Sequence, residues 1–346
     1  MKPLDYTARN HLGGQLQTAE TLRERGENRI RREVDVVIVG AGPGGLCAGH
    51  VLAEAGMSVL VLEAGQFWQV KSFKRDQTWA TEHLYQEQGA RFSTGNSLIP
   101  VASGRGVGGG TLVNSGISFR TPERVLDEWY EEFGVEIWAP GRRDAQFQEV
   151  EDRIGVAPTS EAVAGGNTAV ARRGFEAMGV DHAYMPRNMP GCAGCGTCQT
   201  GCPVGGKASA DLNWLPHMLR DGGELYADTR VEELKIEGGR AVGVRGVTRM
   251  PETDREVAVV EVDADRVVLA CGAIYTPMML QRQGLANSSG QVGRNLHMHP
   301  GVSVLAYMSE DVEIWNGATQ GYYAHHPDEQ DVIAETFSAP VEALYT

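Results

Sequence analysis

A glycine-rich run near the N-terminus has the residue types and spacing that bind a diphosphate. The run from Gly40 to Gly45 (GAGPGG) follows the short β-branched stretch Val34–Val39 and matches G-x-G-x-x-G. In this pattern Gly40 permits a tight turn, Gly42 lets backbone approach a pyrophosphate, and Gly45 allows a helix to pack closely on a strand. The amides at the start of the following helix then hold the anion without a cationic side chain.

An acidic residue at the end of the next predicted strand completes this unit. Glu63 lies 18 residues beyond Gly45 and directly follows the predicted strand Ser58–Leu62. A carboxylate at this place accepts hydrogen bonds from ribose hydroxyls, and its charge repels the 2′-phosphate of NADP. The β-α-β unit therefore predicts dinucleotide binding, although the motif alone does not separate FAD from NAD. An NAD-dependent dehydrogenase is accordingly one alternative.

A second glycine-dense loop, Gly104–Gly110, precedes Thr111 and Asn114. Its three successive glycines leave one side of the backbone bare, which suits close contact with a flat or phosphorylated ligand. We expect Thr111 to cap a following helix. A flexible surface loop is the alternative interpretation of this stretch.

Four of the six cysteines are clustered in one short segment. Their spacing, Cys192-x2-Cys195-x2-Cys198-x3-Cys202-Pro203, is that of the bacterial ferredoxin run and favours an iron–sulfur cluster. Zinc is the second choice because its structural sites usually have a longer gap between ligand pairs, and disulfides or bare thiols come third. In two-cluster ferredoxins the fourth cysteine serves the other cluster. This chain has no second run. A single cluster would therefore be bound by Cys202 folding back, by a fourth ligand from elsewhere in the chain, or by three cysteines alone in a three-iron form.

The elements that position these motifs indicate an α/β protein with a Rossmann-like core interrupted by a long insertion. The charge-rich stretch Glu20–Glu33 is predicted to be a solvated helical arm. Helices are predicted over Leu46–Ala55, Val125–Phe133, Asp144–Ile154 and Gly165–Met178, and strands over Val34–Val39, Ser58–Leu62, Arg266–Ala270 and several runs within Leu225–Val262.

Composition narrows the class of protein. Among 346 residues, 31 Lys and Arg stand against 45 Asp and Glu, and the net charge of -14 excludes a general binder of nucleic acid or anionic lipid. Hydrophobic residues make up 42%, enough for a sizeable core. The sequence shows no membrane-spanning apolar run and no secretory signal, so we expect a cytoplasmic protein.

Taken together, these motifs resemble the glucose–methanol–choline (GMC) family of flavin oxidoreductases. The family's basic residue, glycines, small residues and Asn are matched by Arg105, Gly108–Thr111 and Asn114. Its second signature is similar to Gly272–Leu280. The matching stretches occur in the family's order over about residues 34–300.

The match is looser further along the chain. Gln283 stands where the family usually has Ser, and Ala286 where it has Gly. The stretch Gly293–Leu296 with His299-Pro300 is similar to the family's Gly-x-Asn-Leu-x-x-His. The cysteine-rich insertion and Ser118–Trp129 look closest to long-chain alcohol oxidase-like members.

The resemblance implies an FAD-dependent oxidoreductase with a Rossmann-like FAD-binding domain and an inserted α+β substrate or cap region. Such an enzyme oxidises the CH–OH group of a small-molecule alcohol by hydride transfer to the flavin N5. Its electrons go to an acceptor or carrier, by way of the iron–sulfur cluster if one is bound. The implied cofactor-binding residues are Gly40, Gly42, Gly44, Gly45, Glu63, Arg105, Gly108, Gly109, Asn114 and Val231.

The resemblance also divides the chain. It implies an N-terminal arm (1–33), a discontinuous FAD-binding domain (34–130 and 225–300), an insertion with the cysteines (131–224) and the start of a substrate-binding domain (301–346). Family members continue into a segment with the catalytic His and a second His or Asn, and nothing here matches it. We therefore expect a truncated piece or one half of a split enzyme, and assign no catalytic base. A non-catalytic flavin-binding or electron-transfer fragment that needs a partner chain is the other alternative.

Overall fold

The computed structural model describes residues 14–299, 301–329 and 331–338. Residues 1–13 of the predicted arm, Pro300 of the third matching stretch and residues 339–346 at the chain end lie outside the described residues. The chain forms two compact units. Unit 1 comprises Met1–Lys74, Thr78–Val113 and Ala210–Tyr307, and unit 2 comprises Arg75–Gln77, Asn114–Ser209 and Met308–Thr346.

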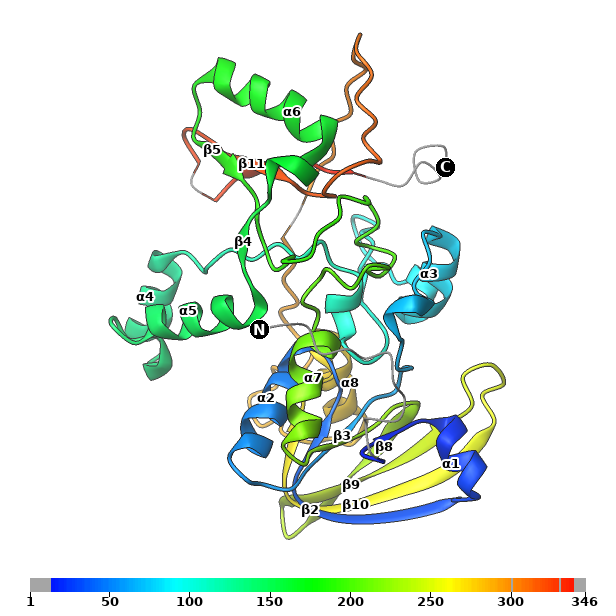
Figure 1. The fold of residues 1–346 in the computed structure, drawn as a ribbon. Coiled ribbons are helices and arrows are strands. Elements are labelled where there is room, and N and C mark those ends of the chain that lie inside the picture. Colours follow the sequence, from blue (N-terminus) through cyan, green and yellow to red (C-terminus); the bar gives the residue numbers. More distant parts are fainter. Residues whose placement is uncertain (1–13, 300, 330, 339–346) are drawn as a thin grey trace. The chain divides into compact units, whose positions relative to one another are not determined.

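A seven-stranded mixed sheet forms the centre of unit 1 (Figure 1). Its order is β1-β7-β3-β2-β10-β9-β8. The first five strands are parallel to one another, and β9 is antiparallel to both of its neighbours, β10 and β8. The strands are β1 (Leu16–Gln17), β2 (Arg29–Val39), β3 (Val59–Leu62), β7 (Glu224–Tyr226), β8 (Thr229–Glu237), β9 (Arg240–Arg249) and β10 (Glu256–Leu269). All four residues of β3 are buried, as expected for a central parallel strand covered on both faces.

Helices α2 (Pro43–Glu54) and α7 (Ala210–Arg220) lie side by side against this sheet (Figure 1). They approach closely because Gly49 has no side chain: a Cβ there would lie 2.6 Å from Met218 Sδ. The other helical segments of this part of the chain are α1 (Ala19–Arg25), α3 (Gln77–Leu84), α8 (Gly272–Arg282) and the short 3-10 turns Val70–Ser72, Gln86–Gly89 and Gly109–Leu112.

Unit 2 combines helices with two small sheets. Its helices are α4 (Glu123–Glu131), α5 (Arg143–Ile154), α6 (Glu161–Met178) and the 3-10 turn Glu136–Trp138. One sheet has the order β12-β11-β5 and the other pairs β4 with β6. These strands are β4 (Ala157–Pro158), β5 (His182–Tyr184), β6 (Pro186–Arg187), β11 (Tyr322–His325) and β12 (Ile333–Glu335).

The predicted α/β class with a Rossmann-like sheet is confirmed. Strand β2 and helix α7 are two of the elements that differ from expectation. Strand β2 begins at Arg29, so the last five residues of the predicted helical stretch Glu20–Glu33 belong to a strand. In this part of β2 the buried Ile30 lies between Arg29 and Arg31, which are exposed. Both arginines form ion pairs with Glu261 of the neighbouring strand β10. The sequence analysis missed α7 because Pro216 lies inside it.

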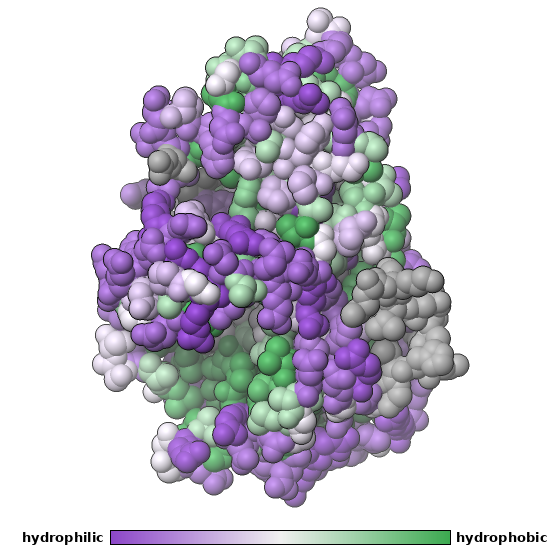
Figure 2. Space-filling view, turned by 60° about the vertical axis from the view of Figure 1, so that its left-hand side comes forward, coloured by the Kyte–Doolittle hydropathy of each residue, from purple (hydrophilic) through white to green (hydrophobic). Residues whose placement is uncertain are grey.

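The two units divide the chain after Val113 and before Ala210, whereas the resemblance implied boundaries at 130/131 and 224/225. Within the described residues, no helix combines the length and hydropathy needed to cross a membrane. Hydrophilic residues cover most of the face presented in Figure 2, in keeping with a chain in which 22% of residues are charged.

Candidate functional site

The carboxyl ends of four parallel strands lie in one row. Leu269 of β10 is opposite Val39 of β2, Val39 is opposite Leu62 of β3, and Leu62 is opposite Tyr226 of β7. The residues that follow these strands are therefore neighbours at one edge of the sheet. In open α/β sheets this edge is where ligands bind.

The first glycine loop occupies this edge, between β2 and α2. Gly40 has φ 103°, and a Cβ on it would lie 2.5 Å from Ala270 O. A Cβ on Gly45 would lie 2.0 Å from Gly40 O, so the predicted close packing of helix on strand is present. By contrast, a Cβ on Gly42 or Gly44 would meet nothing within 4 Å. The start of α2 thus presents bare backbone beside open space, which fits the diphosphate of a dinucleotide.

Glu63 lies beside this loop, as the sequence predicts. Its side chain is buried, and its two carboxylate oxygens accept hydrogen bonds from the backbone N–H groups of Ala41 and Gly65, each at 2.8 Å. Burial raises the pKa of Glu63, while these hydrogen bonds and the charge of Arg105 oppose the rise. The acid is therefore held at the bend where a ribose next to a bound diphosphate would need an acceptor.

The second glycine loop touches the first. The N–H of Gly108 donates to Ala41 O at 2.8 Å, and a Cβ on Gly109 would lie 2.8 Å from the Cα of Gly42. A side chain at Gly109 would therefore push the two loops apart. This contact favours a ligand loop over the flexible surface loop that was its alternative.

Thr111 caps a helix, but a different one from the helix expected. The residues around it form the 3-10 turn Gly109–Leu112, and its hydroxyl accepts the N–H of Ala210 at 3.0 Å. The same hydroxyl donates to Gly108 O at 2.6 Å. Thr111 therefore joins the second loop to the start of α7, a contact across 99 residues of sequence that local patterns do not reveal.

Sequence reasoning missed one acidic residue at this edge. Asp228 follows β7, has φ 56°, and is 8% exposed. Its Oδ2 accepts the N–H of Ala19 at 3.1 Å, and its Oδ1 has no hydrogen-bond partner among the described residues. Burial raises the pKa of Asp228 to about 6. The hydrogen bond from Ala19 and the charge of Arg105 oppose this rise, and the charges of Glu252 and Glu63 add to it.

Two models of known protein families match the segments that form this edge of the sheet. A family model described as GMC oxidoreductase matches residues 81–301, and one described as FAD binding domain matches residues 33–76. The chain belongs to the GMC oxidoreductase family. The second match covers the first glycine loop and Glu63, which supports FAD as the cofactor.

Several GMC relatives are similar over most of the chain. An uncharacterized GMC-type oxidoreductase of Mycobacterium tuberculosis is 36% identical over 88% of this chain and 48% of its own length. A long-chain-alcohol oxidase of Arabidopsis thaliana is 31% identical over 85% of this chain and 40% of its own. The chain thus spans about half the length of the curated relatives it matches. The fold is similar to that of pyridoxine 4-oxidase from Mesorbium loti, with TM-score 0.58 and 18% identity over 88% of this chain and 65% of that one.

Three further residues implied by the GMC resemblance lie in different settings. The Arg105 N–H donates to Leu84 O at 2.7 Å, and the Asn114 carbonyl accepts Lys207 Nζ at 2.8 Å. Val231 lies in β8 with its side chain in the core of unit 1. Contacts of these three residues with FAD stay predictions.

Gln283, where the GMC pattern has Ser, has a structural role of its own. Its amide oxygen accepts the N–H of Leu234 at 3.0 Å, and its amide nitrogen donates to the Leu234 carbonyl at 3.1 Å. The side chain thereby ties the end of α8 to strand β8. This departure from the GMC pattern is explained by that pair of bonds.

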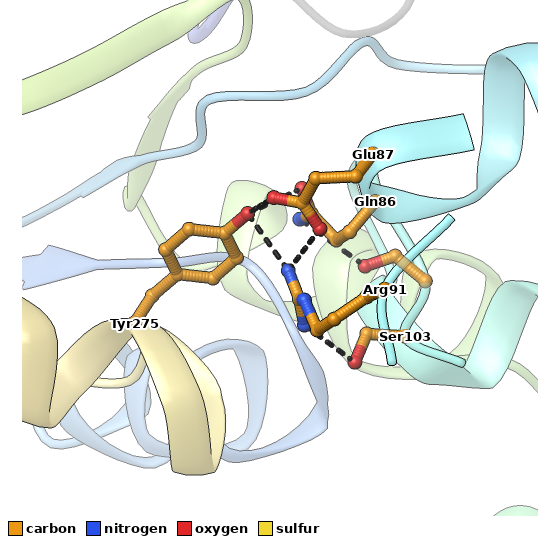
Figure 3. A network of polar contacts seen from close by, with 6 residues as sticks. Gln86, Glu87, Arg91, Ser103 and Tyr275 are labelled. Atoms are coloured by element: carbon orange, nitrogen blue, oxygen red, sulfur yellow. Dashed lines mark hydrogen bonds and ion pairs between the residues drawn. The ribbon is translucent and has the colours of Figure 1, made fainter. Parts of the chain in front are cut away.

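A polar network joins the second GMC signature to the segment after α3 (Figure 3). Tyr275, on α8, donates its hydroxyl to Glu87 and accepts Arg91 Nη2 at 2.8 Å. Arg91 also pairs with Glu87, donates to Ser103 Oγ at 3.1 Å, and lies over the Tyr275 ring at 5.0 Å. Burial and the bond to Glu87 raise the pKa of Tyr275, which keeps its hydroxyl a donor at neutral pH.

Among the described residues, neither the four clustered cysteines nor Cys47 and Cys271 form a disulfide bond. Among the residues that the structure describes, no three His, Cys, Asp or Glu side chains form a group that could hold a metal ion. This finding supports neither the zinc site nor the iron–sulfur site. The family comparisons do not support an iron–sulfur cluster either, and that part of the prediction remains a hypothesis.

Proposed function

We propose that this protein oxidises the CH–OH group of a small-molecule alcohol with FAD as its cofactor. The observation that supports the proposal is the contact between the two glycine loops at the carboxyl edge, with Glu63 buried beside them. The match to the GMC family supports flavin chemistry. Relatives that are named long-chain-alcohol oxidases support an alcohol as the substrate class.

The protein's part in this reaction is to bind and orient. The bare backbone at Gly42 and Gly44 and the first amides of α2 would hold the diphosphate, and Glu63 would accept the ribose hydroxyls. Gly108 and Gly109 would keep the neighbouring backbone free of side chains. When bound, FAD supplies the electron sink that accepts hydride from the alcohol carbon. A base must also take the hydroxyl proton, and no described residue is assigned to that step.

Anaerobic bleaching of bound flavin tests the proposal. The purified chain, loaded with FAD, is mixed with a series of primary and secondary alcohols, and the flavin absorbance is followed. We expect at least one alcohol to bleach the flavin. Bound flavin that no alcohol bleaches would support the non-catalytic flavin-binding fragment instead. A chain that binds NAD but no flavin would support the NAD-dependent dehydrogenase.

The proposal also includes a one-electron carrier as the electron acceptor. Its support is the cysteine run, whose spacing is that of electron-transfer proteins. Bleached enzyme is exposed either to oxygen or to a one-electron dye, and the return of the flavin absorbance is timed. Faster recovery with the dye is expected. Faster recovery with oxygen would indicate an oxidase.

A further inference from the structure

The four cysteines of the run line one common cavity in unit 2. The remaining walls come from the same loop and from the segment around Gly317, and include Met189, Ala193, Val204, Gly317 and Ala318. The segment approaches closely because Gly196 has no side chain: a Cβ there would lie 2.1 Å from Trp315 O. Three glycines with positive φ, Gly194, Gly196 and Gly201, turn the loop around this space. The four cysteines therefore belong to one site.

Cys202 folds back into the same cavity as the other three cysteines. Its side chain is buried, and its Sγ accepts the N–H of Gly206 at 3.2 Å. In a ferredoxin with two clusters, the equivalent cysteine would leave to bind the second cluster. Here the fold places the fourth thiol where a single cluster needs it, without a remote ligand.

The arrangement suits a cluster better than a single ion. A structural zinc ion is usually held by two ligand pairs with a longer gap between them, whereas these four cysteines lie within residues 192–202. In an iron–sulfur cluster each thiolate binds a different iron atom, so the four sulfurs stand apart around a central body. Four cysteines that line one cavity would supply the four ligands of such a cluster.

Two buried cations lie beside Cys198. Arg187, 2% exposed, donates from Nη2 to Cys198 Sγ at 3.1 Å and from Nε to Ser115 O at 2.8 Å. Lys207, 1% exposed, donates to the carbonyls of Cys198 at 3.1 Å and Asn114 at 2.8 Å. The hydrogen bonds that Arg187 makes within the described residues go to Ser115 O and Cys198 Sγ rather than to a carboxylate. A buried guanidinium needs a nearby anion, and thiolate ligands around the cavity would supply it.

We propose that Cys192, Cys195, Cys198 and Cys202 bind one iron–sulfur cluster, and that Arg187 sets its reduction potential through the hydrogen bond to Cys198 Sγ. Each thiol loses its proton as its sulfur binds iron, and the bound cluster gains or loses one electron at a time. A cationic donor to a ligand sulfur stabilises the more negative, reduced state and raises the potential. This site does not depend on the proposed flavin reaction, and its tests do not use alcohol oxidation.

Anaerobic reconstitution of the full chain with iron and sulfide tests the site. We expect about four iron atoms and about four sulfides per chain, with an electron paramagnetic resonance signal after dithionite reduction. Cys202→Ser should lose iron or retain only a three-iron form. Cys47→Ser, which changes a thiol of α2 outside the cavity, should bind as much iron as the wild type. Failure of the wild type to take up iron and sulfide, or its purification with about one zinc ion per chain, would overturn the assignment.

A redox titration monitored by the same signal tests the role of Arg187. Arg187→Met should shift the midpoint potential to a lower value, whereas Arg187→Lys, which keeps a charged donor, should lie closer to the wild type. If Arg187 only supported the fold, its substitution would change the amount of bound cluster but would not place the midpoint potentials in this order. Equal potentials in the three proteins would contradict the role given to Arg187.

Discussion

Asp228 shows what a single residue at the carboxyl edge contributes and why pattern reasoning missed it. It follows a strand of only three residues, Glu224–Tyr226, too short for periodicity to define. Its left-handed conformation, its burial and the lack of a partner at Oδ1 within the described part of the chain are all products of tertiary packing. Burial therefore disfavours the ionised form of the Asp228 carboxyl, and the free energy of unfolding depends on pH as a result.

The pH dependence follows from the direction of this shift. The pKa of Asp228 rises from 3.8 to about 6 on folding, so its contribution to stability is fully present below pH 3.8 and is lost as the pH rises to about 6. Asp228→Asn keeps an acceptor for Ala19, tolerates the positive φ and does not ionise. The variant should gain stability relative to the wild type across this window, by about 3 kcal/mol at most. Urea unfolding between pH 4 and pH 7 measures the gain.

Asp35→Asn is the matched control for that experiment. Hydrogen bonds from Ser58 lower the pKa of Asp35, so its contribution is present above its ordinary pKa and is lost as the pH falls. The stability difference between this variant and the wild type should therefore run in the opposite direction with pH. A difference between Asp228→Asn and the wild type that stays constant with pH would show that Asp228 does not titrate as inferred.

At the scale of elements, local sequence predicted those whose stabilising contacts are themselves local. The strand–loop–helix unit around Gly40 and the acid at Glu63 follow from spacing within one β-α-β unit. Helix α3 was not predicted, because it has few apolar residues and is held by burial of Ala80 and Leu84. Likewise no local motif predicts the positions of Arg187 and Lys207, because their hydrogen bonds to Ser115 and Asn114 join segments that are distant in sequence.

The Tyr275 network predicts how the segment after α3 is held to α8. Tyr275→Phe keeps the ring over Arg91 and removes the hydroxyl that bonds Glu87 and Arg91. Losing these bonds should cost about 1–2 kcal/mol locally, because Arg91 and Glu87 are charged partners. Hydrogen exchange of residues 86–103 should therefore become roughly tenfold faster, since about 1.4 kcal/mol corresponds to a factor of ten.

Tyr307→Phe is the control for this prediction, because Tyr307 is fully exposed and lies in the same unit. It should leave the exchange of residues 86–103 unchanged. Exchange that is equally fast in both variants and the wild type would mean that the network does not hold this segment.

At the scale of the whole molecule, the sequence predicted the fold class and the order of the motifs, and the structure shows where the two glycine loops contact each other. The contact between the two glycine loops joins Gly108 to Ala41 across more than 60 residues, and only the register of the parallel strands brings these segments to one edge. The same register explains why Asp228 lies close to Glu63. The central claim is accordingly that this edge binds FAD.

Equilibrium titration of FAD against Gly42→Ala tests that claim most directly. A Cβ on Gly42 meets no atom within 4 Å, so the variant should fold normally, while its methyl group would enter the space assigned to the diphosphate. Gly174→Ala adds the same methyl group to open space on α6 and serves as the control. We predict at least about tenfold weaker FAD binding in Gly42→Ala, equivalent to about 1.4 kcal/mol, and unchanged binding in Gly174→Ala. Equal affinity of the wild type and Gly42→Ala, with both proteins folded, would contradict the account.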